Sequence, residues 1–370
     1  MNVVIFEHLL CEQLTGHEVW LQVLARGFVN TYGDSVTIVG HQSLSTDVQS
    51  VIGKEFSYAA EFKSHMWEGM TLPFNQEFTQ KRRQVATDIS RVIEKYADAD
   101  LHVFPTAFPT TALGIVSANR RAPQSSLLFH HSHDERLDGR LLESAVILRG
   151  LQKLSTSSVS CLAQNPSLAA EFAELGVSCR TAPYPFFGEL PDGPRQGPLR
   201  RIGIMGHQRD DKDNGLLLPL INALLAEGFL VTYHNSKGAP CVLEHEGLTK
   251  IERHLSPTDF AEQIASCDAV IITNPQNAHV KRISGVCLDA LSSAVPVIVP
   301  QKTHMSRMVN RGDAGVCYEE RSVVSILRAV KRAERNYAAL GSNAFQAGKW
   351  LHRTGGYDRL VESLRGGARV

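Results

Sequence analysis

The sequence predicts an α/β protein in two halves, each built on a sheet of parallel strands. Short apolar runs that suit buried parallel strands alternate along the chain with segments of helical periodicity. Residues 184–198 separate the halves and contain four prolines, three glycines and no periodic pattern. With 370 residues, of which 43% are apolar, the chain is long enough to form two hydrophobic cores.

The first half begins with a buried strand over residues 3–6, and a helix follows over residues 18–32, whose apolar side chains recur at a spacing of four. Residues 44–72 have little periodicity, so we expect short strands and irregular connections there. Further strands are expected over residues 36–39, 101–104, 126–129 and 159–163, and further helices over residues 78–97, 110–119, 142–151 and 165–175.

The second half begins with a strand over residues 201–205, a polar loop over residues 206–215 and a helix over residues 216–227. Pro219 lies in the first turn of this helix, where proline is tolerated. Further strands are expected over residues 230–234, 268–273, 295–299 and 314–318, and further helices over residues 256–266, 284–294, 304–309 and 322–337. The tail, residues 341–364, reads as helical with a break at two glycines.

The composition excludes several classes of protein. Acidic and basic residues are equal in number, 38 each, which argues against a nucleic-acid partner. The seven cysteines are scattered without a C-x-x-C pair, as expected for reduced thiols in a cytoplasmic protein. We also expect neither a signal peptide nor a membrane-spanning helix.

A candidate phosphate site lies at the start of the helix that precedes the strand over residues 295–299. Ser284 and Gly285 open this helix, and two cations, Lys281 and Arg282, come shortly before it. Unpaired backbone N–H groups and positive charge therefore converge at one point, which favours an anion. The alternative is that Ser284 is only a helix cap and that the cations are solvated.

The polar loop after the strand over residues 201–205 carries Arg209 and Lys212, at the strand end where open α/β sheets bind ligands. The same loop contains Asp211 and Asp213, a D-x-D pattern that could hold a divalent metal. Because the two cations already supply positive charge, a metal would be redundant, and we expect solvated aspartates instead.

A cluster of histidines follows the strand over residues 126–129. His130, His131 and His133 lie within four residues, and two carboxylates come next. One interpretation is a metal site on His131 and His133, although no third ligand is suggested elsewhere. A second is an imidazole that binds an acceptor or transfers a proton, and a third is an ordinary polar loop.

Taken together, these motifs resemble glycosyltransferases of the GT-B architecture, in particular retaining family 4. The resemblance rests on Gly206 to Arg209 with Lys212, and on residues 284–291 and 294–299. It implies two Rossmann-like domains that face a central cleft. The implied divisions are an acceptor domain over residues 1–183, a linker over 184–199, a nucleotide-sugar domain over 200–345, and a C-terminal helix over 346–370 that packs back on the first domain.

The resemblance also implies roles for individual residues. Lys212 and Arg209 would bind the diphosphate of the donor, although the family arginine follows the glycine directly, where this chain has His207. The backbone N–H groups of Ser284, Gly285 and Val286 would add to that site, with Arg282 beside them. Asp289 would hold the ribose. Gly16 and His17 take the place of the family's glycine-rich loop, and either His130 or His131 matches its cleft histidine.

One departure from the family pattern concerns the sugar. In the family, the first motif glutamate binds the donor sugar, and this chain has Lys281 in its place.

The expected activity is metal-independent, cofactor-free transfer of a sugar from a nucleotide-sugar donor to a hydroxyl of a saccharide or glycolipid acceptor, in surface polysaccharide biosynthesis. The alternatives are a GT-B nucleotide-sugar epimerase and a catalytically inactive GT-B scaffold. The basic run at residues 81–83 could also bind the surface of an anionic membrane, which would make the protein a peripheral membrane protein.

Overall fold

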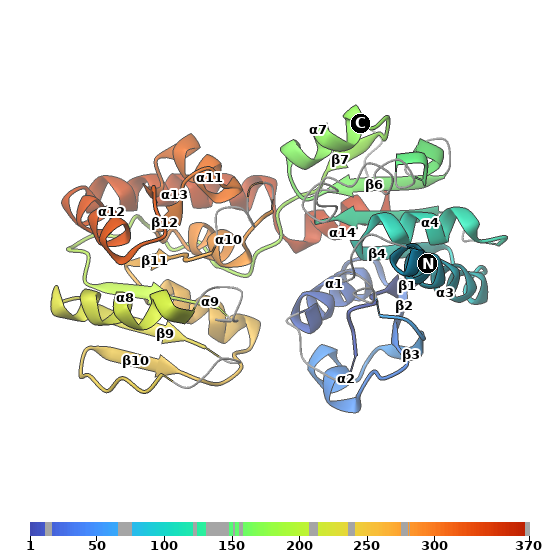
Figure 1. The fold of residues 1–370 in the computed structure, drawn as a ribbon, viewed down its shortest axis with the longest axis horizontal. Coiled ribbons are helices and arrows are strands. Elements are labelled where there is room, and N and C mark those ends of the chain that lie inside the picture. The colour runs from blue at the N-terminus through green and yellow to red at the C-terminus, as the bar shows by residue number, and fades with distance from the viewer. Residues whose placement is uncertain are drawn as a thin grey trace. The chain divides into compact units, whose positions relative to one another are not determined.

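A computed structural model gives the structure of the chain, which forms two compact units (Figure 1). Unit 1 comprises Met1–Pro183 with Tyr357–Val370, and unit 2 comprises Tyr184–Gly356. The structure describes residues 1–11, 17–65, 76–120, 124–130, 148–150, 152–154, 158–206, 214–235, 241–274, 280 and 282–366.

Unit 1 is built on a sheet of seven parallel strands in the order β3-β2-β1-β4-β5-β6-β7. The strand order reverses between β1 and β4, which makes their carboxyl ends the topological switch point of the sheet. The strands are β1 (Asn2–Phe6), β2 (Ser35–His41), β3 (Ser57–Phe62), β4 (Leu101–Ala107), β5 (Gln124–Phe129), β6 (Val159–Ala163) and β7 (Cys179–Thr181).

Alternation along β1 produces the two hydrophobic layers of unit 1. Successive side chains of a strand point to opposite faces, so Val4 and Phe6 enter one core cluster while Val3 and Ile5 enter another. The first cluster includes apolar residues of α3 and α4, and the second includes those of α1 and α14. The helices are α1 (His17–Tyr32), α2 (Thr46–Ile52), α3 (Gln76–Lys95), α4 (Pro109–Ser117), α7 (Pro166–Glu174) and α14 (Tyr357–Arg365).

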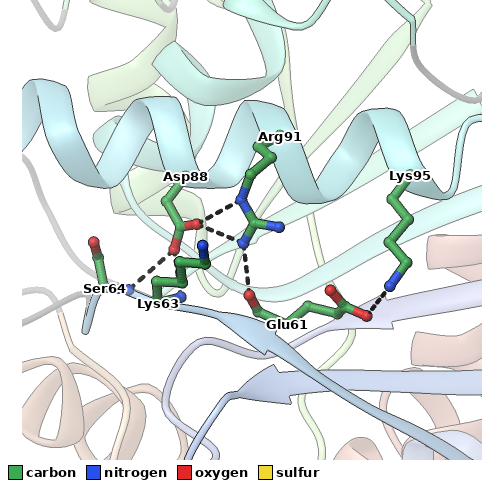
Figure 2. Close-up of polar contacts among 6 residues, drawn as sticks. All are labelled: Glu61, Lys63, Ser64, Asp88, Arg91 and Lys95. Atoms are coloured by element: carbon green, nitrogen blue, oxygen red, sulfur yellow. Dashed lines mark hydrogen bonds and ion pairs between the residues drawn. The ribbon is translucent and has the colours of Figure 1, made fainter.

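Polar contacts join α3 to the end of β3, as Figure 2 shows for Glu61, Lys63, Ser64, Asp88, Arg91 and Lys95. The buried Asp88 carboxylate accepts hydrogen bonds from the backbone N–H groups of Lys63, at 2.7 Å, and Ser64, at 3.0 Å. Arg91 binds the other oxygen of Asp88 and donates to the Glu61 carbonyl oxygen at 2.6 Å. Asp88 therefore fixes the backbone at the point where the chain leaves β3.

The C-terminal helix α14 belongs to unit 1. Ser126 donates to the carbonyl oxygen of Leu364 at 2.5 Å, and Arg365 pairs with the buried Asp34 at 3.0 Å. Asp34 also accepts the N-terminal ammonium group at 2.9 Å, and the two cations lower the pKa of its carboxyl against the effect of burial. This carboxylate therefore ties the two ends of the described chain to one place.

The return to unit 1 occurs at Tyr357 rather than at residue 346, which corrects the predicted boundary. Helix α13 (Tyr337–Thr354) continues through residue 346 and packs against α10 (Gly285–Ser292), so it stays in unit 2. The chain leaves this helix at Gly355 and Gly356, where the latter takes a φ of +100° that suits glycine.

Unit 2 is built on a sheet of six parallel strands in the order β10-β9-β8-β11-β12-β13. Its strand order reverses between β8 and β11. The strands are β8 (Arg201–Ile204), β9 (Leu230–His234), β10 (Leu248–Ile251), β11 (Ala269–Ile271), β12 (Val297–Pro300) and β13 (Gly315–Tyr318). The remaining helices are α8 (Asn214–Ala226), α9 (Pro257–Ala265), α11 (His304–Gly312) and α12 (Val323–Arg335).

The proline- and glycine-rich segment that follows Pro183 packs against unit 2. The Gly356 N–H donates to the carbonyl oxygen of Tyr184 at 2.8 Å, and the Arg195 guanidinium donates to the carbonyl oxygen of Ala265 at 2.5 Å. An added Cβ at Gly341 would lie 2.7 Å from the Arg195 carbonyl oxygen, so α13 needs glycine there to approach the segment. The segment is thus a packed part of unit 2.

The two predicted parallel sheets and their Rossmann-like order are confirmed. The edge strands β7 and β10 were not predicted, and neither was α2, which lies in the stretch expected to be irregular. Ser45 caps this helix by accepting from the Val48 N–H at 3.3 Å, and Gly53 ends it with a φ of +141°. With only seven residues, α2 is too short to show a helical period in the sequence. Among the described residues, no helix is long and apolar enough to cross a membrane.

Candidate functional site

The carboxyl edge of the unit 2 sheet carries the candidate donor site. Gly206 follows β8 with a φ of +96°, and Thr273 follows β11 on the other side of the switch point. Two side chains hold the main chain after β11: Tyr318, the last residue of β13, donates to the carbonyl oxygen of Ile272, and Arg321, beyond β13, donates to that of Thr273, each at 2.8 Å. The backbone that follows β11 is therefore fixed by side chains of β13 and of the residues after it.

Helix α10 begins at this edge, as the sequence predicted. Ser284 is its N-cap, and its hydroxyl accepts from the Cys287 N–H at 3.3 Å. Gly285 has open space where a side chain would stand, since an added Cβ would meet no atom within 4 Å. The backbone N–H groups of Gly285 and Val286 lie in the first turn, where a helix supplies no acceptor of its own. The partly buried Arg282 comes two residues before the cap.

Asp289 lies on the buried side of α10. One of its carboxylate oxygens accepts from the Phe187 N–H at 2.8 Å, and only 6% of the residue is exposed. Burial raises the pKa of this carboxyl to about 7, while hydrogen bonds from the backbone of Phe187 and Gly188 act in the opposite direction. Asp289 thus holds the segment that follows Pro183. The ribose contact expected for it stays a prediction.

We predict that Asp289→Asn changes the pH dependence of stability. Because the pKa of Asp289 is higher in the folded protein than in the unfolded chain, ionisation costs the folded state stability as the pH rises from about 4 to about 7. One pKa unit corresponds to about 1.4 kcal/mol, so the wild type should lose up to about 4 kcal/mol across this window that the asparagine variant keeps. Urea unfolding at pH 4 and pH 7.5 measures the difference, and identical losses in the two proteins would contradict it.

A histidine that the sequence analysis did not single out lies after β12. His304 is the first residue of α11 and is 5% exposed, and its Nε2 lies 3.3 Å from the Tyr184 hydroxyl. Burial, reinforced by the charge of Arg307, lowers its pKa to about 4, so the imidazole is neutral near pH 7. The preceding Lys302 has a φ of +60°, a strained conformation for a residue with a side chain.

The carboxyl edge of the unit 1 sheet gathers a second group of polar side chains. Glu7 directly follows β1, and its Oε2 accepts from the Thr106 hydroxyl of β4 at 2.6 Å. Glu18 lies fully buried in the first turn of α1. His130 directly follows β5, with its Nε2 2.6 Å from the Pro105 carbonyl oxygen and its ring edge-on to Trp20. Glu7 was missed, although it is the first charged residue after the opening strand.

Several predicted residues lie outside the described part of the chain. These are Gly16, His131, His133, Arg209, Asp211, Lys212, Asp213 and Lys281. His17 is described only as the first residue of α1. Within the described residues, no group of three or more His, Cys, Asp or Glu side chains could hold a metal ion.

The fold is that of GT-B glycosyltransferases. The chain is similar to the glycosyltransferase SnogD from Streptomyces nogalater, with a TM-score of 0.62, 18% identity and 99% of each chain covered. It is also similar to Anabaena Alr3699/HepE in complex with UDP-glucose, with a TM-score of 0.66 and 11% identity over 99% of this chain and 98% of that chain.

A third similar structure is the sucrose-phosphate synthase of Thermosynechococcus elongatus, with a TM-score of 0.64 and 9% identity over 99% of this chain and 98% of that chain. No protein-family model and no curated protein sequence matches the chain. The similarity therefore lies in the three-dimensional fold, since the identities are only 9% to 18%.

Proposed function

We propose that this chain is a glycosyltransferase that moves a sugar from a nucleotide-sugar donor to a hydroxyl of a saccharide or glycolipid acceptor. The observation that carries the proposal is the carboxyl edge of the unit 2 sheet. There the open first turn of α10 and the left-handed Gly206 flank the switch point, within a fold shared with a protein crystallised with UDP-glucose.

The donor's diphosphate is the group that this edge suits. Backbone N–H groups at a helix N-terminus favour anions, and the loop after Gly206 adds Arg209 and Lys212. As the glycosidic bond to the nucleotide breaks, negative charge grows on the departing diphosphate, and fixed cations stabilise it. Because these cations supply the charge, we propose that transfer needs no metal ion.

The acceptor hydroxyl is assigned to unit 1, beside the histidines that follow β5. The Nε2 of His130 is engaged with the Pro105 carbonyl oxygen, which leaves His131 as the better candidate for contact with the acceptor. Retention of the anomeric configuration, a role in surface polysaccharide assembly and peripheral contact with a membrane are further parts of the proposal that come from the family resemblance.

A thermal-shift panel of UDP-, GDP- and dTDP-sugars, repeated with EDTA, tests the proposal. A donor present at 100 times its Kd should stabilise the protein by about 2.7 kcal/mol, which raises the Tm of a unit the size of unit 2 by roughly 5–10 °C. We expect one nucleotide to give this shift, and EDTA to leave it unchanged. The absence of a shift with every donor would contradict donor binding, and loss of the shift in EDTA would contradict metal independence.

Product analysis with the donor identified by that panel separates the remaining possibilities. Formation of a new glycoside in an acceptor screen supports a transferase. Conversion of the donor sugar without an acceptor would indicate an epimerase, and binding without any turnover would indicate an inactive scaffold.

A further inference from the structure

Two cysteines lie opposite each other on the last two strands of the unit 1 sheet. Cys161 of β6 and Cys179 of β7 are register partners in this parallel pair. Among the register pairs of the described strands, it is the only one that joins two cysteines. Both thiols are free, so the structure shows the reduced form of the pair.

The geometry of a parallel sheet brings these two side chains together. Neighbouring strands lie about 4.8 Å apart, and register partners project from the same face of the sheet. A disulfide needs a separation of roughly 4.4–6.8 Å between its two Cα atoms, so the pair is within reach of a bond. Both side chains also belong to one hydrophobic cluster, in which Cys161 is buried and against which the partly buried Cys179 packs.

Strand β7 is the partner that can adjust to such a bond. It is three residues long and lies at the edge of the sheet, with only β6 beside it. The Ala182 N–H donates to the Ala163 carbonyl oxygen at 2.7 Å, which extends the pairing by one residue, and the chain enters unit 2 after Pro183. A covalent bond between the two strands would therefore fix the segment that leads to the connection between the units.

We propose that Cys161 and Cys179 form a reversible disulfide in the presence of a low-molecular-weight disulfide such as oxidised glutathione. The Cys179 thiolate attacks the oxidant, and one glutathione thiolate leaves. The Cys161 thiolate then attacks the Cys179 sulfur of this mixed disulfide and displaces the second glutathione. The two cysteines lose two electrons and two protons, and the glutathione disulfide gains them as two thiols.

The exposure of the two thiols sets the order of these steps. Cys161 is 4% exposed, whereas Cys179 is only partly buried, so the oxidant meets Cys179 first. Burial raises the pKa of the Cys161 thiol to about 12, and it raises the pKa of Cys179 as well, although the charge of Arg180 acts in the opposite direction. Because the thiolate is the form that attacks, the exchange is slow near pH 7. The bond therefore records sustained rather than brief exposure to an oxidant.

Peptide mapping tests the proposal on the full chain. The protein is incubated with oxidised glutathione at pH 8, and the remaining thiols are alkylated. Trypsin leaves both cysteines in residues 154–180, and cleavage after Glu171 or Glu174 then separates them unless a disulfide joins the two peptides. We expect the joined peptides as the main product, and dithiothreitol should separate them. Glutathione that stays on Cys179, or two cysteines that are still alkylated after prolonged incubation, would overturn the proposal.

Hydrogen exchange and thermal unfolding provide a second readout. In the oxidised wild type, amides of residues 179–182 should exchange about tenfold more slowly than in the reduced protein, because the bond holds β7 on β6. The Tm of unit 1 should rise by roughly 5–10 °C, since the closed loop restricts the unfolded chain. Cys179→Ser, treated in the same way, is the control and should show neither change. Equal changes in this variant, or none in the cross-linked wild type, would overturn the role of the bond in fixing β7. None of these measurements needs a sugar donor, so the inference is independent of the proposed function.

Discussion

Replacing Lys212 or Arg209 by alanine should reduce the rate of sugar transfer by about 100-fold or more, the scale seen when one fixed electrostatic contact to a transition state is removed. The charge on the departing diphosphate grows as the glycosidic bond breaks, so the loss should appear in kcat more than in donor KM. Steady-state kinetics with the donor found by thermal shift measures both constants.

The same loop offers a matched control for this prediction. Asp211 and Asp213 flank Lys212, and their replacement by asparagine removes negative charge without touching either cation. Each variant should retain transfer to within about twofold, because we expect both aspartates to be solvated, and solvated charges contribute little. Wild-type turnover in Lys212→Ala and Arg209→Ala would refute the assignment, whereas a large loss in Asp211→Asn or Asp213→Asn would reopen the metal interpretation of the D-x-D pattern.

Gly315→Ala should destabilise unit 2 strongly. Gly315 begins β13 and pairs with Val297 of β12, and an added Cβ would overlap the Val297 carbonyl oxygen and lie 3.0 Å from its carbonyl carbon. The two strands would have to separate, at a cost of about 3 kcal/mol. Urea unfolding followed by far-UV circular dichroism measures the change.

The separation of β12 and β13 should also disturb the backbone of the candidate donor site. Tyr318 at the end of β13 and Arg321 beyond it hold the backbone that follows β11. Donor affinity should therefore fall together with stability. Gly312→Ala is the control: Gly312 ends α11, and an added Cβ there would meet nothing within 4 Å. Alanine in a helix is favoured over glycine by about 1 kcal/mol, so this variant should be as stable as the wild type or more so. Equal stability of the two variants would contradict the strand-pairing argument.

Much of the fold could be predicted from the sequence because the signals for it are local. The strand over residues 230–234 was predicted with the same bounds as β9, and the capping role considered for Ser284 agrees with the structure. Such elements depend on a periodicity or a cap that a few neighbouring residues carry. The site residues predicted outside the described part of the chain, among them Arg209 and His131, remain predictions, since their support is a resemblance.

What the sequence by itself determined is most of the succession of strands and helices, without α2, β7 and β10, the division near residue 184 and the position of the helix that begins after Ser284. The tertiary structure decided which polar groups meet. Glu7 and Thr106 are 99 residues apart in the chain, and Phe187 and Asp289 are 102 apart. The physical reason is that a strand's own residues set its periodicity, whereas the partner of a buried carboxyl depends on which strands and helices the sheet order brings together.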